Sequence, residues 1–306
     1  MRRHTLFPLL TAISLPLAAC STAYAKEPVQ SASAAPEVTE HKAKNVILFI
    51  GDGMGISTIT AARIYAGQKL GNTGEEYVLP FEKFDNVALV KTYNVDAQVP
   101  DSAGTATAMH SGRKTNIGYL GTGPEAKRGD CVSGQAHPLP LLGEEAKAKG
   151  LAVGIVSTAR LTHATPAAVY ARSTARDWEA DAAIPEDQRG LGCKDIAQQL
   201  VEFDFDVALG GGQGAFFGGD VRGWRLDGAA NLPREWVERT GGSFVTDADG
   251  LAAAPKDKPV LGIFSPSHMT YMAEKKADST EPTLTDMTRE AVQRLSGDSN
   301  GYYLMV

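Results

Sequence analysis

Short apolar segments recur along the chain and are separated by helix-like stretches. The segments are rich in Val, Ile and Leu and hold few polar residues, which is typical of strands buried on both faces of a sheet. The predicted strands are Asn45–Ile50, Ala152–Ser157, Val207–Leu209, Val260–Phe264 and Tyr302–Val306, and the helix-like stretches between them include Pro140–Lys149 and Thr285–Leu295.

This alternation of strands and helices predicts an α/β fold. Consecutive β-α-β units place the strands parallel and the helices on both faces of the sheet. We therefore expect a three-layer α/β/α sandwich around a largely parallel sheet. In such sheets the residues that carry chemistry collect at the carboxyl ends of the strands.

The composition is that of a globular protein, and it excludes one class of partner. With 306 residues, 43% of them hydrophobic, the chain can bury a sizeable core. Its 30 Lys and Arg residues are outnumbered by 36 Asp and Glu residues, for a net charge of −6, and no run of like charge forms a basic face. Nucleic acid is therefore not an expected partner.

The first 25 residues predict an export signal. Two arginines near the start precede an apolar stretch, Leu6–Ala19, that is too short to span a bilayer. Two processing routes remain open. Leu17–Cys20 resembles a lipoprotein signal, which would make Cys20 a lipid anchor, whereas Ala23–Ala25 matches an A-x-A cleavage site. Either route predicts an exported protein, periplasmic or anchored to the outer membrane as a lipoprotein.

The remainder of the chain divides into a tether and one large unit. Residues 26–42 are rich in Ala, Ser, Pro and Glu and show no period, which predicts a flexible tether. No internal repeat and no second shift in composition marks a boundary after that. Residues 43–306 are therefore expected to form one domain or one part of a domain.

Cysteine usage leaves two alternatives open. The chain has three cysteines, and if Cys20 is lipidated or removed with the signal, Cys131 and Cys193 remain. An even number in an oxidising compartment favours one disulfide. Two separate buried thiols are the alternative.

Asp52 is the first candidate for chemistry. It follows the first predicted strand directly and is flanked by Gly51 and Gly53. Glycines on both sides permit an unusual turn and a close approach of the backbone to a ligand, with the carboxylate at the strand's carboxyl end. The residues alone leave open whether Asp52 binds a metal or caps the following helix.

The stretch 99–113, VPDSAGTATAMHSGR, holds almost nothing that could fill a core. Asp101 or Ser102 can cap a helix that begins within Ser102–Met109, which places the Ser102 hydroxyl at the positive helix end beside free backbone N–H groups. Small residues let that end pack tightly and let a polyanion approach. Ser102 is therefore a candidate nucleophile if a metal lowers its pKa. The alternative is an Ala-rich buried helix with a capping serine.

The third stretch is Ser157–Trp178. His163 and Thr165 lie two residues apart, so in an extended strand or loop both face the same side and could support one cation or its bound waters. The guanidinium of Arg176 could bind two oxygens of a phosphate. The alternatives are a surface or core histidine and a solvated helix charge.

These stretches together resemble the alkaline phosphatase family, in the manner of an animal-type-like bacterial member. The segments that carry the resemblance are NVILFIGDGMG, VPDSAGTATAMHSGRKTNIGYLG and VSTARLTHATPAAVYARSTARDW. A weaker likeness continues to the end, so residues 43–306 resemble the N-terminal part of the catalytic domain. The resemblance implies a homodimeric enzyme that hydrolyses phosphate monoesters through a phosphoserine intermediate and releases inorganic phosphate.

The resemblance also implies roles for individual residues. Ser102 would be the nucleophile, Arg176 would hold two phosphate oxygens, and Asp101 would orient Arg176. The implied cofactors are two Zn²⁺ ions and one Mg²⁺ ion. Asp52 would bridge a zinc and the magnesium, Thr165 would bind the magnesium with His163 beside it, directly or through water, and Cys131 and Cys193 would form a disulfide.

Most zinc ligands of the family come from a later segment that would begin after Val306. The remaining histidines do not occupy positions that match the ligand motifs; they are His4, His41, His110, His137 and His268. A catalytic zinc usually has three protein ligands, so we expect the 306-residue chain alone to be inactive. The alternatives to an active enzyme are a catalytically silent fragment that only binds phosphate or metal, and a phosphodiesterase of the same superfamily.

Overall fold

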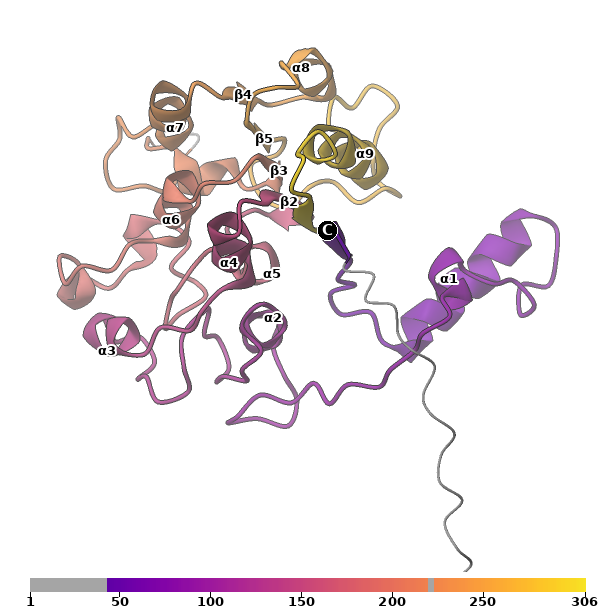
Figure 1. The fold of residues 1–306 in the computed structure, drawn as a ribbon, viewed down its shortest axis with the longest axis horizontal. Coiled ribbons are helices and arrows are strands. Elements are labelled where there is room, and N and C mark those ends of the chain that lie inside the picture. Colours follow the sequence, from indigo (N-terminus) through magenta and orange to yellow (C-terminus); the bar gives the residue numbers. More distant parts are fainter. Residues whose placement is uncertain (1–42, 220–222) are drawn as a thin grey trace, which may run out of the picture. The chain divides into compact units, whose positions relative to one another are not determined.

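The computed structural model describes residues 43–219 and 223–306 (Figure 1). The predicted export signal, Cys20 and the predicted tether lie outside the described residues. In chain order the elements are β1 (Val46–Leu48), α1 (Ile56–Lys69), α2 (Ser102–Ser111), α3 (Cys131–Ala136), α4 (Leu142–Ala148), β2 (Ala152–Arg160), α5 (Ala164–Ala167), α6 (Ile196–Glu202), β3 (Val207–Gly211), α7 (Leu232–Thr240), β4 (Ser243–Val245), α8 (Ala248–Ala253), β5 (Val260–Ile263), α9 (Leu284–Leu295) and β6 (Tyr302–Met305), with short 3-10 helices at Pro80–Lys83, Asp181–Ala183, Glu186–Gln188 and Gln213–Phe216. Within the described ranges, every helix is too short or too polar to span a bilayer.

The strands form one sheet in the order β1-β6-β2-β3-β5-β4, and every neighbouring pair is parallel. This confirms the predicted parallel sheet. Strand β4 was not predicted, because a three-residue Ser-Phe-Val segment is too short to give a periodic signal. Strand β2 extends beyond the predicted end to Arg160, with an irregular register after Val156.

Alternate residues of the strands pack on two separate cores. In β2, Val153 and Ile155 belong to a core shared with α2, α4, α5, α6 and α7, whereas Ala152 and Val156 face a core shared with α8 and α9. Figure 1 shows α4 and α9 on opposite sides of the strands. Each fully buried aliphatic side chain stabilises the fold by about 1.5–3 kcal/mol. The predicted three-layer α/β/α sandwich is therefore confirmed.

Strand β1 departs from its prediction. It was expected to be buried on both faces, but Val46 and Ile47 keep 47% and 38% of their surface exposed. The reason is its place at the edge of the sheet, where it pairs with β6 alone. Leu48 and Ile50 still pack against the core, so the end of β1 that leads into Asp52 is the better anchored one.

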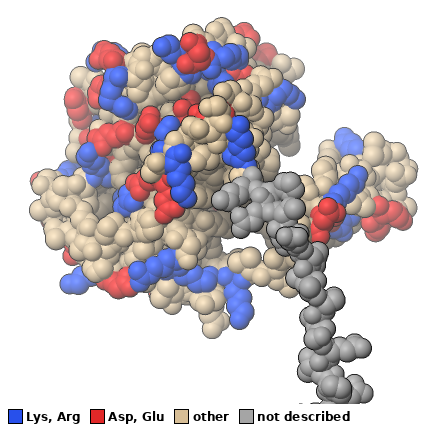
Figure 2. Space-filling view, in the orientation of Figure 1, with Lys and Arg blue, Asp and Glu red and all other residues tan. Residues whose placement is uncertain are grey.

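Charged side chains are mixed over the surface. Figure 2 shows Lys and Arg interspersed with Asp and Glu over the described part of the face in view. Several of these charges form ion pairs, such as that of Lys147 with Asp206 at 3.0 Å. Lys147 and Asp206 are only partly exposed, whereas fully exposed ion pairs contribute about 0–1 kcal/mol each.

Cys131 and Cys193 form a disulfide, with their Cα atoms 5.6 Å apart. Of the two alternatives for these cysteines, the structure therefore shows the pairing that the resemblance implies. The bond joins the first residue of α3 to the loop before α6 and closes a loop with a sequence separation of 62 residues.

Removal of this disulfide is expected to lower the free energy of unfolding by about 4 kcal/mol, because the unfolded chain regains the entropy of an open loop. The measurement is urea denaturation of the variant with Cys131→Ser and Cys193→Ser. A reducing agent should shift the parental midpoint by a similar amount and leave the double variant unchanged. A parental midpoint that does not respond to reductant would show that the bond does not form.

Candidate active site

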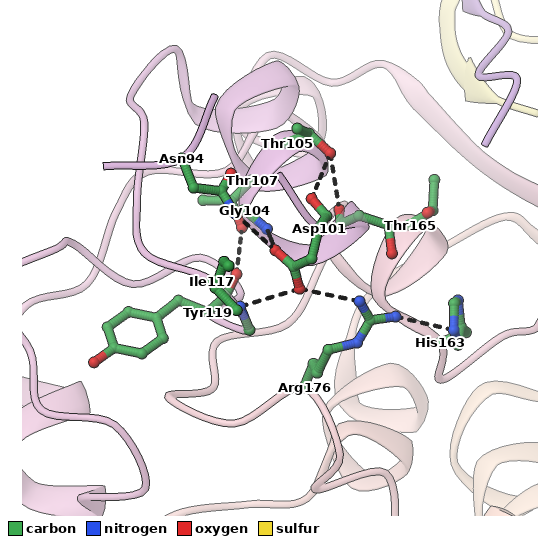
Figure 3. A network of polar contacts seen from close by, with 12 residues as sticks. Asn94, Asp101, Gly104, Thr105, Thr107, Ile117, Tyr119, His163, Thr165 and Arg176 are labelled. Carbon is green, nitrogen blue, oxygen red and sulfur yellow. Dashed lines mark hydrogen bonds and ion pairs between the residues drawn. The ribbon is translucent and has the colours of Figure 1, made fainter. Parts of the chain in front are cut away.

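The candidate residues come together at the carboxyl ends of the parallel strands. Asp52 follows β1, and His163 and Thr165 follow β2. The hydroxyl of Thr165 donates to Asp52 Oδ2 at 3.0 Å, across 113 residues of sequence. Figure 3 shows His163, Thr165 and Arg176 around the amino end of α2, where Asp101 lies.

Asp101 is the centre of this network. Its Oδ1 accepts from the backbone N–H of Gly104 at 3.0 Å and from Asn94 Nδ2 at 2.9 Å. Its Oδ2 accepts from the backbone N–H of Gly118 and from Arg176 Nη1, both at 3.0 Å. Burial alone would raise the pKa of Asp101, but these four donors outweigh it and lower the pKa below its ordinary value. Asp101 is therefore a fixed carboxylate that holds Arg176.

Two residues were predicted as possible caps of helix α2, and the structure uses one of them. Asp101 is the N-cap, and Ser102 is the first helical residue rather than the cap. The side chain of Ser102 is therefore not used to complete the helix end. Ser102 and Asp52 line the same cavity of about 340 Å³, together with Thr165.

The small residues of α2 have two structural reasons. Ala103 and Ala106 are buried, and α2 packs closely against α5, which also presents alanines. At Gly104, a Cβ atom would lie 2.5 Å from Asn94 Oδ1. Glycine is needed there because it lets Asn94 reach Asp101.

Substitution of Gly104 by alanine is expected to destabilise the protein by about 1–3 kcal/mol, because the new methyl group displaces Asn94. In a helix without such a contact, alanine is more favourable than glycine by about 1 kcal/mol. A loss of stability would therefore show that the contact with Asn94 outweighs the helix preference of alanine. Urea denaturation measures it, and Gly104→Ala in an Asn94→Ala background should lose most of its cost. Stabilisation by Gly104→Ala alone would contradict the close contact.

His163 and Thr165 were predicted on an extended segment, and this local prediction was wrong. His163 is the N-cap of α5, and Thr165 lies within its first turn. The cause is the chain reversal after β2, where the His163 N–H donates to the Arg160 carbonyl at 2.9 Å. Thr165 still reaches Asp52, but His163 turns toward Arg176, whose Nη2 lies 3.0 Å from His163 Nε2.

The environment of His163 keeps its ring neutral. Burial, followed by the charges of Arg176 and Arg160, lowers the pKa of His163 to about 4. A guanidinium can only donate, so Nε2 of His163 accepts from Arg176. In this arrangement Nε2 is occupied by Arg176 and is not free to bind a cation.

The Asp52 turn matches its prediction in part. Gly53 adopts a φ of +68°, which a residue with a side chain rarely adopts. Asp52 does not cap the following helix, since the N-cap of α1 is Gly55. The alternative that Asp52 caps the helix is therefore wrong. Its carboxylate instead accepts from the Thr165 hydroxyl and lines the cavity.

The donor set fits one of the two implied metals. Asp52 and Thr165 place two oxygens together, and oxygen ligands are those that Mg²⁺ prefers. Zinc prefers nitrogen and sulfur ligands and usually takes three from the protein. Among residues 43–219 and 223–306, no group of three or more His, Cys, Asp or Glu side chains could hold a metal ion. The described residues therefore fit a magnesium ion and do not complete a zinc site.

Several residues of the network were not predicted. Asn94 and Gly118 come from irregular loops and reach Asp101 only through the folded chain. His268 lies in the loop after β5, and its ring centroid is 5.2 Å from that of His163. Its position just beyond the carboxyl end of a predicted strand was the one available signal.

The fold and site define an α/β/α protein that presents a serine at a helix N-terminus beside an arginine able to bind an anion. A family model described as alkaline phosphatase matches residues 43–306. The chain belongs to the alkaline phosphatase family.

Curated relatives agree with this assignment. Over 301 residues the chain is 40% identical to the alkaline phosphatase of Gadus morhua, and over 301 residues it is 42% identical to the tissue-nonspecific isozyme of Gallus gallus. Each alignment covers 92% of this chain but 63% and 58% of the two relatives. The chain thus spans less than two thirds of their length.

Solved structures show the same fold. The alkaline phosphatase of Thermus thermophilus has a TM-score of 0.69 and 28% identity, over 86% of this chain and 49% of that one. A variant of the enzyme from the Antarctic bacterium TAB5, with Mg bound in its M3 site, has a TM-score of 0.61 and 25% identity, over 86% of this chain and 63% of that one.

Proposed function

We propose that this chain carries the nucleophile and the phosphate-binding arginine of an alkaline phosphatase, which hydrolyses phosphate monoesters. The observation that supports this most is the placement of Arg176. Its Nη1 is held by Asp101, the N-cap of the helix in which Ser102 is the first residue. A cation is thus fixed at the helix end where backbone N–H groups also favour an anion.

The proposed binding step uses donors that the network leaves available. Arg176 has five N–H donors, of which one contacts Asp101 and one contacts His163. The others can bind two non-bridging oxygens of a phosphate in bidentate fashion. Asp101 balances the guanidinium charge and fixes its plane, so little reorganisation is needed when the dianion binds.

The proposed chemistry has two transfers. The Ser102 oxygen attacks phosphorus in line, its bond to phosphorus forms as the ester P–O bond breaks, and the alcohol leaves with a proton. Water then attacks the phosphoserine, the bond between phosphorus and the Ser102 oxygen breaks, and inorganic phosphate is released with the serine restored. Arg176 neutralises the charge on the non-bridging oxygens in both steps.

Asp52 and Thr165 are the residues that would hold a magnesium ion, and such an ion supplies positive charge near the phosphate when bound. The TAB5 variant binds Mg in its M3 site. We assign no step to zinc, since the described residues do not complete a site for it. We also propose two Zn²⁺ ions and a homodimer, and both rest on the family resemblance alone.

The function is tested with the chain expressed to the end of its reading frame, supplied with Zn²⁺ and Mg²⁺. Release of p-nitrophenol from p-nitrophenyl phosphate at alkaline pH is the expected result. Preference for bis(p-nitrophenyl) phosphate would instead support the phosphodiesterase alternative. Phosphate binding without turnover of either substrate would support the silent alternative. The same assay on residues 1–306 tests our expectation that these residues by themselves are inactive.

We also propose that the protein is exported and anchored through Cys20. If so, fatty-acid labelling of cells that express the chain should mark the protein, and Cys20→Ser should remove the label while Cys131→Ser keeps it. The processed mass separates the two routes, because cleavage after Ala25 would leave an unlabelled protein that begins at Lys26.

A further inference from the structure

A second chain of polar contacts lies beside the one that holds Arg176. The Arg160 guanidinium binds Glu179 twice, from Nε at 2.8 Å and from Nη2 at 2.6 Å. Its Nη1 lies 2.8 Å from His268 Nε2. A carboxylate, a guanidinium and an imidazole are therefore connected here in the same order as Asp101, Arg176 and His163.

The two chains meet at their imidazole rings. His163 and His268 pack edge to face, with centroids 5.2 Å apart and planes at 77°. They follow β2 and β5, which are separated in the sheet by β3, so strand pairing does not bring them together. Both rings line one cavity of about 370 Å³ that also reaches Asp52.

The ring of His163 has few other anchors. Nε2 accepts from Arg176, so in the neutral ring the proton lies on Nδ1. This Nδ1 is buried, and among the described residues it has no hydrogen-bond partner. Besides its hydrogen bond with Arg176, the His163 ring packs edge to face against the His268 ring, and this second contact restricts its orientation.

His268 is itself well fixed for this purpose. Its Nε2 accepts from Arg160, whose other edge is locked by the bidentate bond to Glu179. Thr162 also donates to Glu179, at 2.5 Å. Burial and then the charge of Arg160 lower the pKa of His268, which favours the neutral, accepting form.

We infer that His268 is a positioning residue for phosphate binding. It holds the His163 ring in the orientation in which Nε2 accepts from Arg176, and so it fixes the guanidinium that binds the phosphate. This rests on the proposed function, because it takes Arg176 as the phosphate ligand. His268 acts through His163, and its removal leaves Arg176 and Asp101 paired but less well oriented.

The test measures inorganic phosphate affinity in the chain expressed to the end of its reading frame, by calorimetry with Zn²⁺ and Mg²⁺ present. His268→Ala is expected to weaken phosphate binding about three- to tenfold. His268→Gln, which can still accept from Arg160, should recover part of the loss. His137→Ala is the control. His137 is the C-cap of α3, and its Nδ1 forms a hydrogen bond with the Ser133 carbonyl oxygen, not with a residue of the candidate site. His268 is an exposed residue, so these variants should fold.

A merely structural role would not give the expected coupling. In an Arg176→Ala background, His268→Ala should cause no further loss of phosphate affinity, because the group that it positions is gone. An equal loss in both backgrounds, or parental affinity in His268→Ala, would overturn the inference while leaving the proposed function intact. A parental chain that binds no phosphate would overturn both.

Discussion

Replacement of Ser102 by alanine is expected to lower turnover of phosphate monoesters by at least about 10³-fold and to abolish the phosphoenzyme. In the proposed mechanism the hydroxyl attacks phosphorus, and the variant has no other oxygen at this position. Because Asp101 and not Ser102 caps α2, the substitution removes no cap. Alanine also favours the helix, so the fold and phosphate binding should persist.

The Ser102 prediction has a matched control in the same helix. Ser111 closes α2 at its other end and donates to the Thr107 carbonyl at 2.7 Å, so Ser111→Ala removes a hydroxyl of α2 outside the site. The measurements are turnover of p-nitrophenyl phosphate and acid-trapped ³²P on the protein after addition of labelled phosphate. Parental turnover or ³²P labelling in Ser102→Ala would exclude Ser102 as the nucleophile.

The sequence predicted the layers of the fold because each layer leaves a local pattern. Continuous apolar runs gave the central strands β2, β3, β5 and β6, and their alternate residues do pack on two cores. The exposure of β1 could not be predicted in this way. Its run Val-Ile-Leu is as apolar as the others, and its place at the sheet edge depends on pairing with β6, which is remote in sequence.

The candidate site was predictable where a motif carries it. Ser102, Asp52 and Thr165 stand in recognisable segments, and the structure places them around one cavity. The supporting contacts were not predictable, because they join unrelated loops. Asn94 and Gly118 donate to Asp101 from segments without a pattern, and no spacing in the sequence relates them to it.

The orientation of His163 shows why a rule based on residue spacing can fail where a helix begins. Two residues of separation from Thr165 predicted a shared face, which holds only in an extended chain. The short helix α5 begins between them and turns His163 toward Arg176. The imidazole of His163 is therefore paired with the guanidinium of Arg176, whereas the oxygen ligand candidates Asp52 and Thr165 are paired with each other.

Replacement of Arg176 by alanine is expected to weaken inorganic phosphate binding by about 10- to 100-fold, because a charge-assisted hydrogen bond contributes about 1.5–3 kcal/mol. Arg176→Lys keeps the charge but not the fork, so it should lose an intermediate amount. Arg113→Ala, an exposed arginine after the end of α2, controls for the loss of one positive charge.

The Arg176 variants also separate phosphate binding from helix capping. Asp101 would keep its bonds from Asn94, Gly104 and Gly118 after Arg176→Ala, so the amino end of α2 should remain formed and urea denaturation should change little. Inhibition of turnover by inorganic phosphate measures the affinity. If phosphate inhibits Arg176→Ala as strongly as the parental protein, the anion is held by the helix end or a metal ion alone, and Arg176 serves only to balance Asp101.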